Sequence, residues 1–333
     1  MYGMTFWDKL PNPFFILAPM EDVTDIVFRH VVARAARPDV YMTEFTNAAS
    51  FCSDKGNFST RGRLTHDDNE QPIVAQIWGT NPDQFRQMAV ALTEQNFAGI
   101  DLNMGCPAKD VFKIGAGSGL IKQPDLAVQL IQAAQESSLP VSVKTRLGVS
   151  RIDEFRTWLP ILLQQNLANL TIHLRTRKEM SKVAAHYELI PEIIVMRDQI
   201  APGTKLTING DIRDYAHAMG LKQQYPGVDG FMIGRGVFAN PYCFDRQSHQ
   251  PNQDELIDLF RYHLDQYDQY RQIMPDERLE VVRNFDSLKH FFKIYVKGFD
   301  GAADLRAKLY NCTSTDEIRQ ILNKAFSLHS QGN

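Results

Sequence analysis

The feature that most constrains the fold of this chain is a regular alternation between short apolar runs and longer amphipathic segments. Eight apolar runs recur across roughly 240 residues, and segments such as 83–95, 125–136 and 154–165 between them repeat apolar residues at spacings of three and four. Short apolar runs separated by helical patterns predict parallel strands joined by crossover helices. The eight runs cover residues 14–20, 40–45, 72–79, 99–105, 141–148, 169–175, 205–210 and 230–236.

Eight strand–helix repeats in this length match the size and repeat number of a (β/α)8 barrel. An open doubly wound sheet is the main alternative for an alternating chain. The strand signals stop after Pro251, and three long periodic segments follow at 254–271, 280–297 and 315–328. We therefore predict an α/β fold, with a TIM barrel over residues 1–245 and a small all-helical C-terminal domain over residues 250–333.

Composition excludes several classes of protein. The chain has 333 residues, of which 44% are hydrophobic and 23% charged, as in ordinary globular proteins. No apolar run approaches about 18 residues, and the N-terminus lacks the basic flank and apolar stretch of a signal peptide. The net charge of −3 does not by itself indicate nucleic-acid binding. We expect a monomer with no membrane segment.

Four scattered cysteines, Cys52, Cys106, Cys243 and Cys312, contain no CxxC pair. This spacing argues against a zinc site, an iron–sulfur cluster and a disulfide framework, so we predict no metal and a reducing cytoplasm. Cys106 is unusual because it lies in DLNMGCPAKD, between a glycine and a proline, where a predicted strand ends. Packing, metal binding and acid–base chemistry are the three roles open to it.

A barrel collects its functional groups at the carboxyl ends of its strands. Polar and special residues do follow the predicted strands, and the glycines of the NGD and GRG motifs suit a phosphate after strands seven and eight. These strand-end residues are Pro19, Met20, Glu44, Gln76, Asn103, Cys106, Lys144, Arg146, His173, Arg175, Asn209, Gly210, Asp211, Gly234 and Arg235.

Four of these positions fit a planar heterocycle beside the phosphate. Lys144 lies inside the apolar strand VSVKTR, where a cation would stabilise an anionic ring such as a flavin. Gln76 offers both a donor and an acceptor, and Pro19-Met20 offers an apolar contact. A salt-bridged barrel lysine is an equally good interpretation of Lys144.

Two further segments have a functional and a structural interpretation. The glycine-rich KIGAGSGLI, residues 113–121, does not connect a strand directly to a helix, so we expect a mobile lid rather than a dinucleotide fingerprint. In the predicted helix 280–297, lysines recur every four residues and form a stripe that suits phosphates, although such charges usually form a solvated face. The residues of this predicted RNA surface are Arg283, Lys289, His290, Lys293 and Lys297.

Six motifs, in order along the chain, resemble those of the tRNA-dihydrouridine synthase family. The GCP motif after strand four, together with APM and GRG…NP, is specific to that family rather than to barrels in general. The motifs are APMEDVTD (18–25), DLNMGCPAKDV (101–111), VKTRLG (143–148), TIHLRTR (171–177), NGDI (209–212) and IGRGVFANP (233–241).

The resemblance implies an FMN-dependent enzyme that reduces one uridine of tRNA to 5,6-dihydrouridine, with NADPH as the reductant. It implies that Cys106 donates a proton and that Asn103 and Arg175 lie near the uracil. Leu174, His186 and Tyr187 depart from the family pattern, which affects the expected tRNA contacts of the loop after strand six. The implied FMN contacts are Pro19, Met20, Gln76, Lys144, His173, Asn209, Gly210, Asp211, Gly234 and Arg235.

The chemistry of this reduction explains the need for a thiol. A hydride added to C6 of uracil leaves negative charge toward C5, and a thiol of ordinary pKa, about 8.5, is protonated at neutral pH and able to quench it. A nucleophilic cysteine would need a partnering base, and the local sequence offers no histidine for that role. Two rivals remain: an FMN barrel acting on a free pyrimidine, similar to dihydroorotate dehydrogenase, and a non-catalytic tRNA-binding protein.

Overall fold

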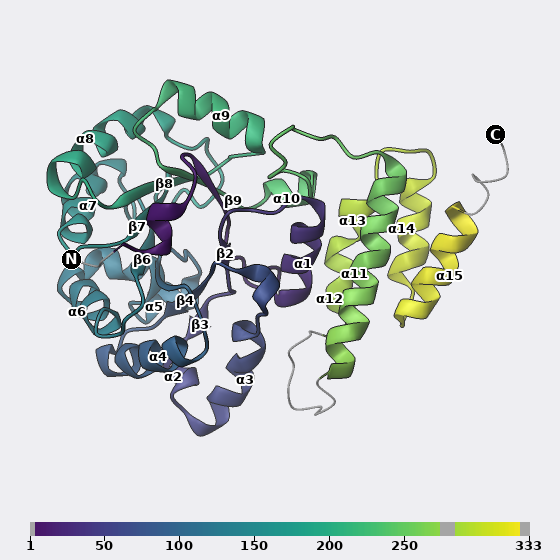
Figure 1. Ribbon diagram of the computed structural model, residues 1–333, viewed down its shortest axis with the longest axis horizontal. Coiled ribbons are helices and arrows are strands. Elements are labelled where there is room, and N and C mark those ends of the chain that lie inside the picture. The colour runs from purple at the N-terminus through teal and green to yellow at the C-terminus, as the bar shows by residue number, and fades with distance from the viewer. Residues whose placement is uncertain (1–3, 274–283, 327–333) are drawn as a thin grey trace.

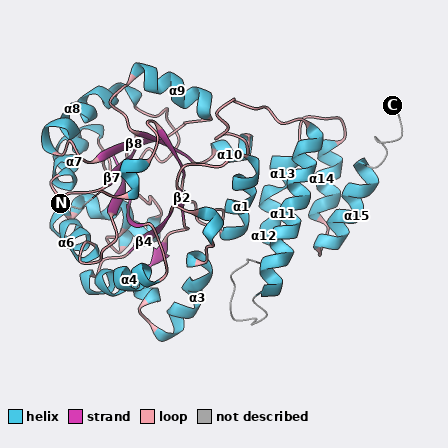
Figure 2. Cartoon of the chain, in the orientation of Figure 1, coloured by secondary structure: helices cyan, strands magenta, loops and turns pink. Residues whose placement is uncertain are grey.

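A barrel of parallel strands surrounded by helices forms the first part of the molecule (Figure 1; Figure 2). The computed structural model describes residues 4–273 and 284–326. Strands pair in the order β1-β9-β8-β7-β6-β5-β4-β2, and a parallel bridge between Ile16 and Val40 joins the two ends, so the predicted (β/α)8 barrel is confirmed. The strands are β1 Phe14–Leu17, β2 Tyr41–Met42, β3 Thr46–Asn47, β4 Ile73–Trp78, β5 Gly99–Met104, β6 Val141–Arg146, β7 Asn169–His173, β8 Lys205–Asn209 and β9 Gly230–Ile233.

The second predicted strand is broken in two. β2 and β3 have two residues each, and both pair with β4. Between them the Thr43 N–H still donates to the Val74 carbonyl at 3.1 Å, and the Thr43 hydroxyl donates to the carbonyl of Glu44 at 2.9 Å. The buried Glu44 carboxylate accepts from the backbone N–H of Asp22 at 2.6 Å. The break therefore lets this strand fix the loop that follows β1.

The inside of the barrel has an apolar side and a polar side. Trp7, from the 3₁₀ helix η1 (Phe6–Lys9), packs with apolar residues of β1, β2, β4 and β9. Strands β5 to β8 instead bury polar side chains, including Asp101, Ser142, Thr171 and Thr207. Because buried polar groups need partners, this side carries an internal hydrogen-bond network.

The helices around the barrel follow the amphipathic segments. In α4 (Pro82–Glu94), Asn81 caps the first turn and the buried residues Phe85, Met88, Ala89 and Leu92 recur at spacings of one, three and four. The other helices of this region are α1 Ile26–Ala35, α2 Ala48–Phe51, α3 Asp54–Leu64, α5 Lys109–Lys113, α6 Pro124–Ala134, α7 Phe155–Leu163, α8 Ile190–Ile200, α9 Tyr215–Gln224, α10 Gly236–Ala239 and the 3₁₀ helices η2 Asp68–Glu70, η3 Gly117–Lys122, η4 Ile152–Glu154 and η5 Tyr187–Leu189.

After α10 all the regular secondary structure of the described residues is helical. The expected helices 254–271 and 315–328 correspond to α11 and α15, whereas the expected helix 280–297 differs. Its described part is two short helices and a 3₁₀ turn that end at Tyr295, and a separate helix follows after Gly298 and Gly301, whose φ angles are +80° and +82°. These elements are α11 Gln253–Ile273, α12 Phe285–Leu288, η6 Lys289–Phe291, α13 Phe292–Tyr295, α14 Ala302–Tyr310 and α15 Thr315–Phe326.

The C-terminal helices pack against the barrel through α1, beside which α11 lies (Figure 1). The ring of Phe28 in α1 stacks on Phe291 with centroids 4.6 Å apart. His263 of α11 bonds the Tyr295 hydroxyl at 2.8 Å, and complete burial lowers the pKa of this histidine to about 3, so it is neutral. Among the described residues, no helix is both long enough and apolar enough to span a bilayer.

Candidate active site

A cavity of about 710 Å³ opens at the carboxyl ends of the barrel strands. Strands β1, β6, β7, β8 and β9 and the loops after them bring its wall together from distant parts of the sequence. Nine of the ten residues expected to contact FMN line it. They are Pro19, Met20, Lys144, His173, Asn209, Gly210, Asp211, Gly234 and Arg235.

Lys144 supplies a half-buried cation to this cavity. Its ammonium has no hydrogen bond or ion pair among the described residues, so the salt-bridged interpretation does not apply. Burial, followed by the charge of Arg146, lowers the pKa of Lys144 to about 8, which leaves it mostly protonated at neutral pH. An anionic group in the cavity would find an ammonium that no described side chain bonds directly, and on which the buried Asp101 acts only through its charge.

His173 supplies a neutral donor beside Lys144. Burial and the neighbouring Arg146 hold the pKa of His173 well below its ordinary value. Nη1 of Arg146 lies 3.3 Å from Nδ1 of His173 and can only donate, so Nδ1 accepts and the other ring nitrogen carries the proton. Arg146 also donates to the carbonyl of Gly105 at 2.8 Å, which connects the cavity wall to the Cys106 loop.

The glycine-rich end of the cavity carries two arginines around one carboxylate. Asp211, at φ +53°, accepts from Arg175 and also from Arg235, whose Nη2 lies 3.1 Å away. Gly236 is required here, because a Cβ would lie 2.2 Å from the carbonyl of Arg213. This end of the cavity therefore offers the exposed guanidinium of Arg235. It also has a closely packed backbone that leaves no room for a side chain at position 236.

Arg175 does not reach the cavity as expected. Its side chain is almost completely buried and donates to Asp211 and, at 2.7 Å, to the carbonyl of Val183. Its Nη1 is buried and has no hydrogen-bond partner in the described part of the chain. Arg175 therefore fixes Asp211 and the loop after β7, and its expected place near the uracil stays a prediction.

Gln76 is the one expected FMN contact that does not line the cavity. Its Nε2 donates to Asp101 at 2.7 Å and its Oε1 accepts from Nδ2 of Asn103 at 2.9 Å. Asn103 is equally occupied, because its Oδ1 accepts from the backbone N–H of Cys106 at 2.8 Å. Both amides lie inside the barrel wall, where they hold the Cys106 loop instead of facing a ligand.

Cys106 is half-buried at the end of β5. Burial raises the pKa of its thiol, against the opposing charges of Arg146 and Lys144, so the thiol is protonated at neutral pH. This favours acid–base chemistry over nucleophilic chemistry, which needs a lowered pKa. All four cysteines are free, so disulfide pairing plays no part.

The glycine-rich segment after Cys106 is packed down, contrary to the expected mobile lid. Residues 116–120 are buried, and Ser118 donates to the carbonyl of Cys106 from both its N–H, at 3.1 Å, and its hydroxyl, at 2.8 Å. Gly117 has φ +56°, and a Cβ there would lie 2.9 Å from the same carbonyl. The glycines thus allow a close approach that braces the Cys106 loop.

Comparison with known proteins shows the family of the chain. A family model described as "Dihydrouridine synthase (Dus)" matches residues 16–330. The chain belongs to the dihydrouridine synthase family. The resemblance inferred from the six motifs is confirmed.

Relatives are similar along nearly their whole length. The chain is 55% identical over 318 residues to "Probable tRNA-dihydrouridine synthase 2" of Bacillus subtilis (strain 168), covering 96% of this chain and 95% of that protein. It is 56% identical over 319 residues to "Probable tRNA-dihydrouridine synthase" of Staphylococcus aureus (strain COL), with the same coverage.

Solved structures share the fold at low identity. Histamine dehydrogenase from Rhizobium sp. 4-9 superposes with a TM-score of 0.54 at 10% identity, over 76% of this chain and 48% of that one. A 2-naphthoyl-CoA reductase complex gives 0.52 at 8% identity, over 68% and 48%. This chain spans about half the length of both, and the likeness concerns the barrel fold alone.

The expected RNA stripe does not form on one helix. Lys289 pairs with Asp286 at 2.7 Å, and Lys297, beyond the end of α13, donates to the carbonyl of Ala239. His290 and Lys293 are exposed. Arg283 lies outside the described residues. The 3₁₀ turn and the early helix end explain why a spacing of four did not give one continuous face.

The loop after β7 has contacts that the sequence interpretation did not predict. The guanidinium of Arg177 lies 3.8 Å from the centroid of the Phe112 ring, which joins this loop to the loop after β5. His186 bonds Glu179 at 3.0 Å, and the Tyr187 hydroxyl donates to the carbonyl of Gly210 at 2.6 Å. His186 and Tyr187, which depart from the family pattern, therefore support the loop and the cavity wall. The sequence signal for the other contact was the aromatic Phe112 in one loop and the basic Arg177 in the other.

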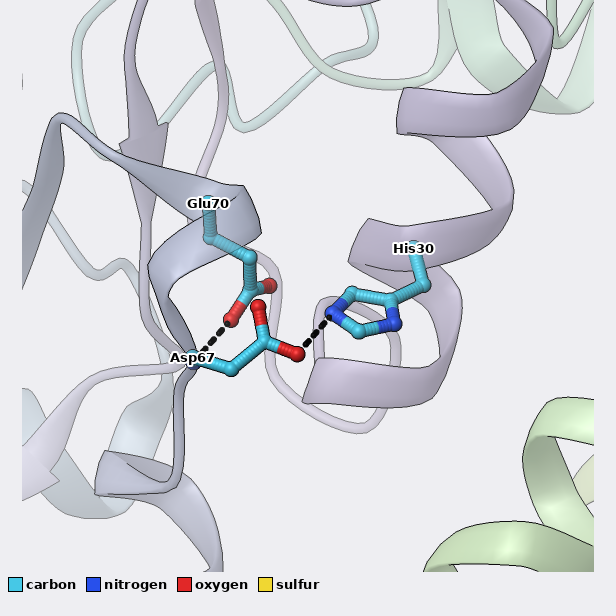
Figure 3. A group of neighbouring side chains, drawn as sticks. All are labelled: His30, Asp67 and Glu70. Atoms are coloured by element: carbon cyan, nitrogen blue, oxygen red, sulfur yellow. Dashed lines mark hydrogen bonds and ion pairs between the residues drawn. The ribbon is translucent and has the colours of Figure 1, made fainter.

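A second polar cluster lies away from the cavity and has a structural role. His30, Asp67 and Glu70 meet closely enough to hold a metal ion (Figure 3). Glu70, however, pairs with the buried Arg29, with Nε and Oε1 2.6 Å apart. The Tyr270 hydroxyl of α11 donates to Asp67 at 3.0 Å. The cluster joins the barrel to α11 and already has partners for its charges.

Proposed function

We propose that this protein reduces a uridine of tRNA to 5,6-dihydrouridine, with FMN bound in the cavity and NADPH as the source of electrons. The single observation that carries the proposal is the cavity itself, which is lined by an unpaired Lys144 ammonium and a neutral His173. The protonated Cys106 does not line this cavity; it lies in the loop after β5, close enough for the charge of Lys144 to act on it. The names of the relatives supply the substrate, a tRNA uridine.

The residues present fit FMN. Lys144 makes no ion pair with a described residue, so its ammonium is available to an electron-rich ring. Arg235 and the close-packed backbone at Gly234 and Gly236 suit the phosphate. Pro19 and Met20 offer the apolar contact for the ring.

The chain's own residues divide the work of the reaction. FMN, when bound and reduced, supplies the hydride that reaches C6 of the uracil. Lys144 and His173 bind the ring and keep water from competing for it. Cys106 holds its proton because burial disfavours the thiolate, and delivers it to C5 as negative charge develops there.

Further parts of the proposal concern the partner and the setting. We assign tRNA binding to the helical region after residue 250 and the flavin to residues 1–245, as two domains of a cytoplasmic monomer. Exposed His290 and Lys293 of the helical region support a surface for phosphates. No step of the proposal uses a metal.

The test combines the purified protein with FMN, NADPH and tRNA from a strain that lacks dihydrouridine. We expect a yellow protein and dihydrouridine in the digested tRNA, detected by mass spectrometry of nucleosides. Parallel reactions with free uracil and orotate separate this activity from that of a free-pyrimidine reductase. A protein that binds no FMN, or that reduces only the free base, would contradict the proposal.

A further inference from the structure

A continuous chain of hydrogen bonds runs from the inside of the barrel to the Cys106 loop. Asp101 is completely buried, and its two oxygens accept from Nε2 of Gln76 at 2.7 Å and from the Ser142 hydroxyl at 2.6 Å. Gln76 then accepts from Asn103, and Asn103 accepts from the backbone N–H groups of Cys106 at 2.8 Å and Gly105 at 3.2 Å. Every donor in this chain points toward Asp101.

The strand register explains why these groups meet. Gln76 of β4 pairs with Asp101 of β5, and Asp101 pairs with Ser142 of β6. Asn103 lies two residues after Asp101, so it faces the same side of the sheet one step closer to the cavity. Three adjacent strands therefore place the chain directly beneath the Cys106 loop.

The two ends of the chain determine the orientation of both amides. Backbone N–H groups can only donate, so the oxygen of Asn103 faces Cys106 and its nitrogen faces Gln76. An ionised carboxylate can only accept, so the nitrogen of Gln76 faces Asp101. Removing the acceptor at Asp101 would leave a buried N–H of Gln76 unpaired and allow both amides to turn.

We propose that Asp101 is a positioning residue for the reaction, which acts through Gln76 and Asn103 to hold the Cys106 thiol where it can protonate the base. The inference rests on the proposed function for its tRNA readout. Asp101 neither lines the cavity nor bonds the thiol, and its hydrogen bonds reach the Cys106 loop through the two amides.

Charge adds a second effect to the same residue. Lys144 on the neighbouring strand is the charged group that acts on Asp101, whose other close neighbours, Gln76 and Ser142, are neutral. Burial raises the pKa of Asp101 to about 6, so the carboxylate is ionised at neutral pH and remains an acceptor. The Asp101 charge in turn favours the protonated form of Lys144.

The experiment compares Asp101→Leu, which removes the acceptor, with Asp101→Asn, which keeps an acceptor oxygen for Gln76. Two half-reactions are measured separately: reduction of bound FMN by NADPH, which does not need Cys106, and reoxidation of the flavin by tRNA. We expect Asp101→Leu to slow the tRNA step about 100-fold, as small misplacements of a reacting group do, and the NADPH step less than about threefold. Asp101→Asn should recover most of the tRNA step.

A readout on the thiol itself makes the inference independent of the tRNA activity. The rate at which iodoacetamide labels Cys106 is measured across pH by mass spectrometry of the Cys106 peptide. This rate should change about tenfold in Asp101→Leu, whereas the rate of labelling of Cys52 should not change. If wild-type protein makes no dihydrouridine, the proposed function fails while this labelling still tests the position of Cys106.

Two further variants make the test decisive. Gln76→Met breaks the chain of hydrogen bonds in its middle, and the same readouts test the inference with this variant if Asp101→Leu does not fold. The double variant Gln76→Met/Asp101→Leu should reduce tRNA no more slowly than either single variant. Thr171→Val, which removes a different buried hydrogen bond from the barrel interior, is the control for general destabilisation. Equal losses in both half-reactions, or unchanged Cys106 labelling and tRNA reduction in Asp101→Leu, would overturn the inference.

Discussion

At the scale of single residues, burial decides what each ionisable group of the cavity can do. The same low-dielectric setting lowers the pKa of Lys144 and His173 and raises that of Cys106. A cation, a neutral donor and a protonated acid thus coexist at neutral pH within one site. Arg146 links them, because it bonds His173 and the Gly105 carbonyl at the same time.

The pH dependence of FMN binding follows from Lys144. Because its pKa is about 8, the ammonium that attracts an anionic ring is lost as pH rises through 8, and FMN affinity should fall above that pH. Fluorescence titration of FMN at pH values between about 6.5 and 9.5, which span this pKa, measures the effect. Lys144→Met should bind FMN about 10- to 100-fold more weakly and show no such pH dependence. An equally steep decline in Lys144→Met would assign the effect to another group.

The stability of the flavin-free protein should respond to the same group with opposite sign. The folded-state pKa of Lys144 lies below its ordinary value of 10.5, so between about pH 8 and 10.5 the unfolded chain binds more protons than the folded one. Stability therefore gains from Lys144 as pH rises through that window. Flavin-free Lys144→Met should lack this gain and be more stable than wild type at pH 7, as measured by thermal unfolding. A less stable variant at pH 7 would contradict the cost assigned to the buried charge.

Cys106 gives the next prediction at this scale. Cys106→Ala should keep FMN binding and reduction by NADPH, and lose dihydrouridine formation by a factor of about 100 or more, as expected for removal of a general acid. Rapid mixing of reduced variant with tRNA, followed by flavin absorbance, measures the step. A variant that turns over at the wild-type rate would assign the proton to another group or to water.

At the scale of elements, the sequence predicted what periodicity encodes and missed what tertiary contacts decide. Repeated apolar spacings determine the eight-fold alternation, and strand ends in a barrel must converge, so nine of the residues named from the sequence line one cavity. Spacing does not record which partner a side chain selects. Gln76, Arg175 and Lys297 have the expected positions along the chain, but Asp101, Asp211 and the Ala239 carbonyl occupy their polar groups.

The glycine-rich segment shows the same limit. Its composition fits a flexible lid as well as a close-packed turn, and only the distance from Gly117 to the Cys106 carbonyl separates the two. We expect Gly117→Ala to destabilise the protein by about 1–3 kcal/mol, because alanine is strained at φ +56° and its methyl group would displace Cys106. Thermal unfolding and tRNA reduction should both decline.

Gly203→Ala is the matched control for this substitution. Gly203 has no atom within 4 Å of its added Cβ, so its replacement should change stability by less than about 0.5 kcal/mol. If Gly117→Ala behaves like Gly203→Ala, the segment is not the brace described for the Cys106 loop.

At the scale of the whole molecule, the helical region is joined to the barrel at α1 by stacked rings and by the polar cluster of His30 and Asp67 (Figure 3). Two kinds of contact, one apolar and one hydrogen-bonded, hold α11 at one place on the barrel. An RNA bound to the helical region would thus be presented to the cavity from a fixed direction. The free cations of that region, rather than its total charge, should determine how it binds.

Two lysines of the helical region should contribute differently to the salt dependence of tRNA binding. Lys293 is exposed, whereas Lys297 is half-buried, burial lowers its pKa, and it donates to the Ala239 carbonyl. Each phosphate contact contributes roughly 0.7–0.9 to the slope of log affinity against log salt. Lys293→Met should therefore weaken tRNA binding and reduce that slope by about one.

Lys297→Met should leave the slope unchanged and lower the thermal stability instead, because it removes a contact between the helical region and α10. Filter binding at salt concentrations between about 50 and 300 mM measures the slope for both variants. The reverse result, a smaller slope for Lys297→Met alone, would place Lys297 on the RNA and remove its role in joining the two regions.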